Sequence, residues 1–393
     1  MRRRNFLTVF VILFLSGCAI ARHAVPLDLS DSVAISGMRD IRALGGSPSD
    51  VFAKDFMNLL EQEEKECVFL FNSRLKDTYS MLTISGGAAN GAYGAGLLAG
   101  WTQEGSRPDF KIVTGISAGA IIAPFAFLGS GYDGELKEFC TRYRTKDILR
   151  IRLSNNSFSS PRPLESLINK YFSDKFLKEI AVEYRKGRRL YVGTTNLDAQ
   201  RLVIWDMGKI ASMENDKAFS LFRKIILASS SVPIAFPPVY LNVEIDGKVY
   251  DEMHVDGGVM KQVFFLYDIL RGLDKAVKTK NIDITKIRSR IYVLRNGYVD
   301  PSWKEVPDRL PAIAERTVET MVNSQSIGDI YQLYAFVKLH DGDFNLAYIP
   351  GTHISKAKEP FDSIEMNALF DLGFQEASVG YNWKKNPPGF DSE

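Results

Sequence analysis

A serine between small residues is the strongest chemical signal in this sequence. The pentapeptide at residues 115–119 reads Gly-Ile-Ser-Ala-Gly, and it follows the apolar run at 110–114 and precedes a second apolar stretch. A strand that enters a helix through such a turn places the serine on a tight bend, with its hydroxyl beyond the end of the sheet. Gly115 and Gly119 leave room for the backbone to double back. The pattern predicts that Ser117 is a nucleophile, with a glycine-rich turn lacking chemistry as the alternative.

Backbone donors for a developing oxyanion are predicted upstream of this serine. Residues 85–91 read Ser-Gly-Gly-Ala-Ala-Asn-Gly and lie between a predicted strand and a predicted helix. N–H groups at a helix N-terminus favour negative charge. Gly86, Gly87 and Ala88 are therefore candidates for an oxyanion hole. A plain tight turn is the alternative, whereas a dinucleotide cradle fails because the glycine spacing differs from G-x-G-x-x-G.

An acidic residue at the end of a later strand is the candidate base. A predicted strand at 248–255 is followed by Asp256, Gly257 and Gly258. In open α/β sheets, catalytic groups gather at the carboxyl ends of the strands. An aspartate has an ordinary pKa of about 4, so it can serve as a base for serine only where a dry pocket raises that pKa. Asp-Gly pairs also occur in ordinary turns and caps, and that interpretation stays open.

The elements that position these residues are predicted to form an α/β fold. From residue 80 onward, short β-type runs alternate with helical stretches, which is typical of βαβ units. Strands are predicted at 81–85, 110–114, 189–196, 202–205, 248–255 and 290–294. Helices are predicted at 89–104, 118–128, 134–143, 164–172, 216–228, 309–339 and 363–381. We therefore expect a mostly parallel sheet sandwiched between helices.

Composition and charge exclude some classes of function. The 393 residues are 45% hydrophobic, which is enough to fill a substantial core. The 49 basic and 47 acidic side chains nearly cancel, so no global field favours binding to nucleic acid. The three cysteines and four histidines form no cluster with the spacing of metal ligands. Neither a metal nor another cofactor is expected.

The N-terminus predicts export and lipidation. Arginines at 2–4 precede an apolar run at 6–15 that is too short for a permanent membrane helix. The sequence Leu-Ser-Gly-Cys at 15–18 resembles the bacterial lipoprotein cleavage box, in which Cys18 becomes the acylated first residue. Two or more attached acyl chains give stable membrane anchoring. An uncleaved anchor or an ordinary signal peptide is the alternative.

These signals divide the chain into four segments. Residues 1–17 are predicted to be a signal peptide, and residues 18–79 a lipidated tether with a helix at 51–67. Residues 80–383 are predicted to form the hydrolase domain, and residues 384–393 a flexible tail. After processing, Cys67 and Cys140 remain, and the sequence leaves open whether they pair.

Taken together, the serine pentapeptide, the donor loop and the aspartate resemble the patatin-like phospholipase family. The segment 228–239, Ala-Ser-Ser-Ser-Val-Pro-Ile-Ala-Phe-Pro-Pro-Val, looks like the family's sequence ahead of the aspartate strand. Residues 189–196 and 366–374 are also similar to family elements, and the resemblance covers residues 80–381. It implies a three-layer patatin-like architecture.

The resemblance also implies roles for individual residues. Ser117 would be the nucleophile and Asp256 its base in a dyad without histidine, with Gly86, Gly87 and Ala88 as oxyanion donors. Support of these motifs would come from Asn90, Gly91, Gly115, Gly119, Gly257 and Gly258. The family usually has a third glycine at the position of Ala88 and an arginine or lysine at that of Asn90. Residues 259–262, Val-Met-Lys-Gln, also lack the asparagine that commonly follows the aspartate, so the chain departs from the pattern three times.

The function implied is a lipid acyl hydrolase that works through an acyl-enzyme. Phospholipase A or lysophospholipase activity at a membrane surface is the leading expectation, with membrane lipid as the partner and no nucleic acid. The resemblance implies the Gram-negative cell envelope. Ala19 after the acylated cysteine is unlike an inner-membrane retention signal, so an outer-membrane lipoprotein that faces the periplasm is expected, while the sequence leaves the leaflet and the side of the membrane open. The sequence leaves the oligomeric state open.

Two other classes of function remain. An α/β-hydrolase with a Ser-Asp-His triad would run from Ser117 through Asp256 to His340 or His353 in chain order. His254 shares a strand face with Asp256, and a lone histidine of this kind is usually a satisfied polar contact. The second of these classes is a catalytically inactive envelope lipoprotein that uses the fold for binding.

Overall fold

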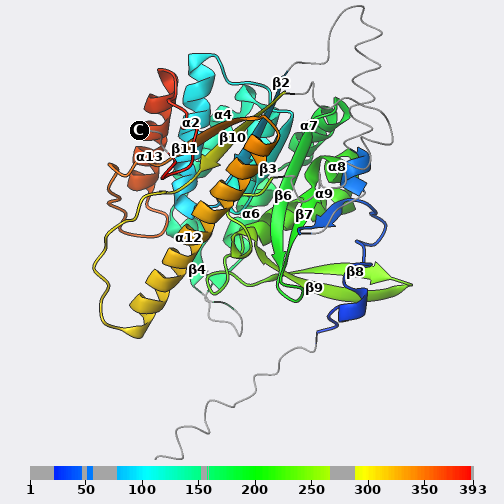
Figure 1. The fold of residues 1–393 in the computed structure, drawn as a ribbon. Coiled ribbons are helices and arrows are strands. Elements are labelled where there is room, and N and C mark those ends of the chain that lie inside the picture. The colour runs from blue at the N-terminus through cyan, green and yellow to red at the C-terminus, as the bar shows by residue number, and fades with distance from the viewer. Residues whose placement is uncertain are drawn as a thin grey trace, which may run out of the picture.

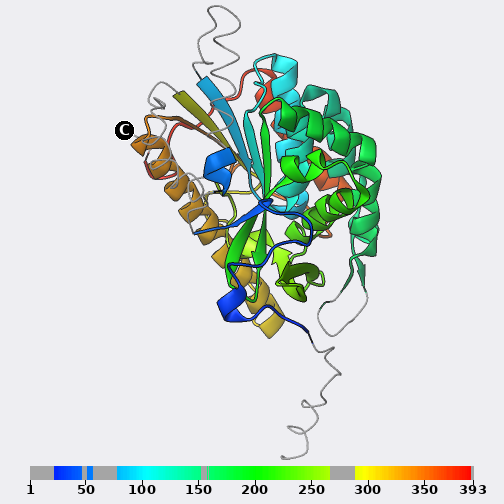
Figure 2. The same cartoon turned by 90° about the vertical axis from the view of Figure 1, so that its right-hand side faces the viewer.

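A nine-stranded sheet with helices on both faces organises the protein (Figures 1 and 2). The structure is a computed structural model that describes residues 22–46, 51–55, 78–151, 157, 159–265 and 288–390. The predicted signal peptide at 1–17, Cys18, Cys67 and most of the helix predicted at 51–67 lie outside these residues. Residues 51–55 are helical.

The centre of the sheet is parallel. Its strands, in spatial order, are β6 (Arg189–Asn196), β3 (Ile112–Gly115), β2 (Thr78–Ile84), β10 (Arg288–Arg295) and β11 (Asp343–Tyr348). Every residue of β3 and β6 is buried, as expected for parallel strands that are covered on both faces. The carboxyl ends of these strands share one edge, so the residues that follow β2, β3 and β10 meet there.

An antiparallel region extends the sheet beyond β6. It consists of β7 (Arg201–Asp206), β1 (Arg42–Leu44), β9 (Lys248–Asp256) and β8 (Val239–Ile245). One side of β6 pairs with β7, while its other side pairs first with β3 and then with β9. The register matches Val192 of β6 with Gly115, and Thr194 with Asp256. Asp256 therefore lies just past the carboxyl end of β3.

Helices form the outer two layers. One face carries α2 (Gly91–Glu104), α3 (Ala118–Leu128), α4 (Asp133–Arg142), α6 (Arg162–Tyr171), α7 (Asp174–Arg185), α8 (Met207–Ser212), α9 (Asp216–Ser229) and α13 (Ser363–Ser378). The other face carries α12 (Leu310–Leu339), the long helix drawn in orange in Figure 1. A short helix, α5 (Thr145–Ile148), and the two-stranded ribbon of β4 (Arg150–Ile151) and β5 (Ser159–Ser160) complete the described elements.

Strand alternation separates two hydrophobic cores. Tyr292 and Leu294 of β10 pack into the larger core beneath α2 and α13, whereas Ile291 and Val293 pack into the smaller core beneath α12. The prediction of a mostly parallel sheet sandwiched between helices is confirmed. Each predicted strand and helix from residue 80 onward has a counterpart, while the strands β1, β4, β5, β8 and β11 and the helices α5, α7 and α8 were not predicted.

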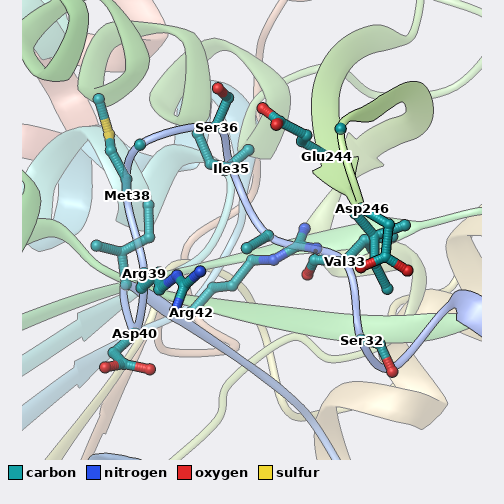
Figure 3. A pocket seen from close by; sticks show the side chains of 15 residues that line it. Ser32, Val33, Ile35, Ser36, Met38, Arg39, Asp40, Arg42, Glu244 and Asp246 are labelled. Carbon is teal, nitrogen blue, oxygen red and sulfur yellow. Dashed lines mark hydrogen bonds between the residues drawn. The ribbon is translucent and has the colours of Figure 1, made fainter.

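The N-terminal segment packs more closely than a tether would. Within residues 22–46, β1 pairs with β7, and Val33, Ile35 and Met38 are buried. A hollow of about 940 Å³ lies between residues 32–42 and residues 244–247, and Figure 3 shows the side chains around it. None of the predicted site residues lines this hollow.

The C-terminal segment also makes specific contacts. The residues from 384 onward were predicted to be a flexible tail. Lys384 instead pairs with Leu346 of β11, and the ring of Phe390 packs on Tyr331 and Tyr334 of α12. Among the residues that the structure describes, no helix is long and apolar enough to cross a membrane.

The contact between α2 and α13 requires glycine. A β-carbon at Gly96 would come within 2.0 Å of the Phe370 carbonyl oxygen, which is backbone and cannot move aside. We therefore expect Gly96→Ala to lower the free energy of unfolding by about 2–4 kcal/mol, measured by chemical denaturation. Gly134→Ala in α4 is the control, because nothing lies within 4 Å of its added methyl group. The control should leave stability unchanged or raise it by up to about 1 kcal/mol, and equal losses in both variants would contradict this account.

Candidate active site

Ser117 occupies a strained bend between β3 and α3. Its backbone angles are φ 56° and ψ −123°, a conformation that residues with a β-carbon rarely adopt. A β-carbon at Gly115 would meet the Gly119 carbonyl oxygen at 2.2 Å, and one at Gly119 would meet the Ile84 oxygen at 2.2 Å. Both glycines are therefore required by close approach of the backbone. Ser117 also precedes the first residue of α3, where the helix dipole favours negative charge.

The serine segment that follows α9 holds this bend in place. The Ser117 N–H donates to Ser229 Oγ at 3.0 Å, and Ser229 Oγ donates to the Gly193 carbonyl at 2.7 Å. Ser230 Oγ lies 3.5 Å from the Ser117 carbonyl oxygen. These bonds tie the bend to β6 and to the C-terminal end of α9. This segment was identified in the sequence only by its resemblance to the family, and its structural role was not predicted.

The same segment positions Asp256 at the end of β9. The Asp256 N–H donates to the Ser231 carbonyl at 2.9 Å, and Asp256 Oδ1 accepts a hydrogen bond from the Gly258 N–H at 2.7 Å. A β-carbon at Gly257 would come within 2.5 Å of the Gly193 carbonyl oxygen, so β9 turns tightly against β6. The structure thus brings Asp256 and Ser117 together around one corner of the sheet.

Burial gives the Asp256 carboxyl group unusual acid–base properties. Desolvation raises its pKa to about 7, against the opposing effects of the nearby Ser117 hydroxyl and of the hydrogen bond from the Gly258 N–H. Oδ2 is buried and makes no hydrogen bond of normal geometry to any described residue. The carboxyl group therefore approaches the hydroxyl without a fully formed hydrogen bond. Such contacts commonly tighten only when substrate binds.

The predicted oxyanion loop lies against the serine. A β-carbon at Gly86 would lie 3.1 Å from Ser117 Cβ and 3.7 Å from its Oγ. The Gly86 N–H makes a long bond of 3.4 Å to the Gln262 carbonyl. The N–H groups of Gly87 and Ala88 have no acceptor within the described part of the chain. These two groups are therefore free to donate to a substrate oxygen, which keeps the oxyanion role of the loop as a prediction.

Two helix N-termini converge at this loop. Asn90 precedes α2, and a β-carbon at Gly91 would lie 3.2 Å from Ala118 Cβ, the first residue of α3. The partial positive charges of both helix ends therefore point to the same small volume. Ala88 has a φ of 49°, a left-handed angle that glycine adopts at lower cost.

An apolar cavity of about 80 Å³ opens beside Ser117. It lies among α2, α3, α4 and the segment after α9. Its walls include Ala118, Ile122, Phe139, Leu164, Phe236 and Met366. The free thiol of Cys140 also lines it, and burial raises the pKa of that thiol to about 12, so it stays protonated at neutral pH. The cavity suits a hydrocarbon chain much better than a charged group.

The three histidines considered for a catalytic triad, His254, His340 and His353, contact residues other than Ser117 and Asp256. His254 is fully buried, with Nδ1 at 2.9 Å from Thr194 Oγ1 and Nε2 at 3.1 Å from Glu252, and desolvation lowers its pKa. His353 Nε2 lies 2.8 Å from Glu365, and the His340 ring packs on Phe336. None of the three makes a hydrogen bond to Ser117 or Asp256. Across the described ranges, no group of three or more His, Cys, Asp or Glu side chains could hold a metal ion.

Three supporting residues were not predicted from the sequence. Gln262 Nε2 donates to the Gly258 carbonyl at 2.8 Å, and its own N–H donates to Asp329 of α12 at 2.6 Å. Arg295, the last residue of β10, contacts the oxyanion loop. The signal for Arg295 was its place at the carboxyl end of a predicted strand, the same signal that identified Asp256.

A mixed α/β sheet with a serine on a strained strand-to-helix bend is an arrangement typical of serine hydrolases. Residues 82–267 match the model of the family described as patatin-like phospholipase. The resemblance to the patatin-like phospholipases seen in the sequence is thereby confirmed over these residues, and it supports a lipid acyl hydrolase domain.

The chain is also similar in structure to a solved protein. The crystal structure of VipD from Legionella pneumophila is similar with a TM-score of 0.38 and 11% sequence identity, over 78% of this chain and 68% of that chain. No curated protein matches the sequence.

The raised pKa of Asp256 predicts a pH-dependent cost of folding. Because the folded state binds this proton more tightly than the unfolded state, stability falls as the pH rises from the unfolded pKa of about 4 to the folded value of about 7. Asp256→Asn removes the buried charge and should raise the free energy of unfolding by about 2–4 kcal/mol at pH 8.

Denaturation at several pH values measures this effect. At pH 4 the variant and the wild type should be nearly equal, because the buried carboxyl is then protonated. Asp109→Asn is the control. Asp109 is exposed, so this variant should change stability little at either pH. If the stability gain of Asp256→Asn does not grow with pH, the pKa of Asp256 is not raised by burial in the folded state.

Proposed function

We propose that this protein hydrolyses lipid esters with Ser117 as nucleophile and Asp256 as its base. The observation that supports this most directly is the pairing of a strained serine with a buried carboxyl group whose pKa is raised to about 7. An ordinary carboxylate is too weak a base for a serine hydroxyl, whereas one with a pKa near the working pH suits general base catalysis.

The reaction would proceed in two balanced steps. Asp256 takes the Ser117 proton while Oγ attacks the ester carbonyl carbon, and the oxyanion that forms is held by N–H groups of the loop. The C–O bond to the leaving alcohol then breaks, and the alcohol takes the proton from Asp256. Water next attacks the acyl-enzyme by the same route, which releases the fatty acid and restores the Ser117 hydroxyl.

The apolar cavity beside Ser117 supports a substrate with a hydrocarbon chain. A fatty acyl group would bury its methylene groups among Ile122, Phe139 and Phe236, with its carbonyl carbon at Oγ. Within the lipid esters, we propose phospholipase A or lysophospholipase activity. A triglyceride or another acyl ester is the alternative that the same cavity would accept.

Replacement of either member of the dyad should abolish turnover. With a mixed bacterial lipid extract as substrate, Ser117→Ala should release fatty acids at least about 10³-fold more slowly than the wild type. Asp256→Asn should lose about 10²–10⁴-fold, because the hydroxyl then lacks its proton acceptor. Mass spectrometry of the freed acyl chains and lysolipids measures the rate and also identifies the ester bond that is cut.

The controls separate this mechanism from its rivals. His340→Ala and His353→Ala should retain near wild-type rates, and a loss comparable to that of Ser117→Ala in either folded variant would favour a Ser-Asp-His triad. Wild-type protein should react with a fluorophosphonate probe at Ser117. Folded protein that does not react with the probe and releases no fatty acid would support a binding protein without catalysis.

We also propose that the chain is a lipoprotein anchored through Cys18, in the outer membrane and facing the periplasm. The Leu-Ser-Gly-Cys sequence at 15–18 supports the proposal, and an anchor would hold the enzyme at the surface where its substrate is concentrated. In a Gram-negative host, Cys18→Ser should move the chain from the membrane fraction to the soluble fraction, whereas Cys67→Ser should leave it with the membranes. Membrane retention of the Cys18→Ser protein contradicts the anchor.

A further inference from the structure

Arg295 is a buried cation directly behind the predicted oxyanion loop. It is the last residue of β10, the strand that pairs with β2, and β2 leads into the loop. Only 6% of the residue is exposed. Strand alternation directs its side chain to the face of the sheet that α12 covers, opposite to Asn296. Two neighbouring residues of β10 and its extension therefore reach the loop from both faces.

Both residues bind the first two residues of the loop. Arg295 Nη1 donates to Ser85 Oγ and to the Gly86 carbonyl, each at 3.2 Å. The Asn296 N–H donates to Ser85 Oγ at 2.8 Å, and Asn296 Nδ2 donates to the Ser85 carbonyl at 2.9 Å. Because the Gly86 carbonyl and the Gly87 N–H belong to one peptide group, a bond that holds the carbonyl also fixes the direction of the Gly87 N–H.

The Arg295 guanidinium is not part of an ordinary ion pair. Among the described residues no carboxylate lies within ion-pair distance, and Nε has no hydrogen-bond partner. Asp329 attracts it only from a distance and is itself bonded to Lys261 and Gln262. Burial lowers the pKa of Arg295 to about 10, so the group still carries its charge at neutral pH. A buried and incompletely paired charge is costly, which favours a functional reason for it.

The loop itself contains no charge. Residues 85–91 consist of serine, glycine, alanine and asparagine, so any full positive charge near the oxyanion must come from another element. Arg295 supplies one in direct contact with the loop backbone. In a dry site a fixed positive charge stabilises a developing oxyanion more strongly than it does in water.

We propose that Arg295 is a positioning residue for acyl transfer, which orients the oxyanion loop through Ser85 and Gly86 and gives it positive potential. The proposal rests on the proposed function, because it assumes that the loop receives a substrate oxyanion. Arg295 touches the loop and not the substrate, so its effect should fall on the transition state more than on substrate binding.

The test compares Arg295→Gln with Arg295→Lys in the full-length chain. Arg295→Gln removes the charge and keeps a donor, and it should lower kcat about 10–100-fold with KM changed by less than about threefold. The rate of fluorophosphonate labelling at Ser117 should fall by a similar factor. Arg295→Lys keeps the charge, and its kcat should be at least about tenfold higher than that of Arg295→Gln. Arg107→Gln is the matched control, because Arg107 is also buried but lies near the far end of α2, paired with Asp133.

Each outcome decides the proposal. Arg295→Gln with wild-type kcat, or with a loss no larger than that of Arg107→Gln, overturns it, and so does an Arg295→Lys enzyme no better than Arg295→Gln. If Arg295→Gln does not fold, Ser85→Ala removes one acceptor of the guanidinium, and unchanged kcat in that variant overturns the proposal. Wild-type protein that neither hydrolyses lipid nor labels at Ser117 rejects the proposed function instead. If the wild-type protein reacts with the fluorophosphonate probe at Ser117, a loss of kcat in the Arg295 variants can be assigned to Arg295 and counts for the proposal.

Discussion

The site depends on how β6 shares one of its sides between two strands. Along its first half β6 pairs with the parallel strand β3, and along its second half it pairs with the antiparallel strand β9. Since β3 stops at Gly115, the chain must turn away there, and β9 takes the vacated position beside β6. This exchange places Asp256 directly beyond the bend that carries Ser117. Ser117 and Asp256 therefore meet because β3 is shorter than β6, which leaves the second half of β6 free to pair with β9.

The same corner explains why a carboxyl group can be buried there. Serines at the C-terminal end of α9 and just after it hold both members of the pair, because the Ser229 hydroxyl accepts the Ser117 N–H and the Ser231 carbonyl accepts the Asp256 N–H. These bonds hold both backbones at the corner of the sheet, where the Asp256 carboxyl group is buried. Desolvation then raises the pKa of Asp256, which weakens the folded state at high pH and makes the group a better proton acceptor. The cost to stability and the higher proton affinity of the carboxyl group have one cause, which is its burial.

Local patterns in the sequence predicted the parts of this site, and long-range pairing assembled them. The bend at Ser117 and the glycine loop are visible as short motifs because the steric demand on glycine is local. The pairing of one side of β6 with both β3 and β9 cannot be seen in the sequence, since register depends on pairing between distant strands. The N-terminal strand β1 and the contacts of Phe390 were missed for the same reason, because short edge segments carry little periodicity of their own. Arg295 showed only as a cation at the end of a predicted strand.

The oxyanion loop shows why support from distant elements is needed. Ala88 of this loop has a left-handed φ angle, which costs about 1–2 kcal/mol in a residue with a β-carbon. Neutral hydrogen bonds contribute about 1 kcal/mol each, and those to a charged donor about 1.5–3 kcal/mol. The bonds from Arg295 and Asn296 to Ser85 and Gly86 are therefore large enough to outweigh the strain. The loop is held in its strained form by β10 rather than by its own residues, so its geometry is a property of the whole sheet edge.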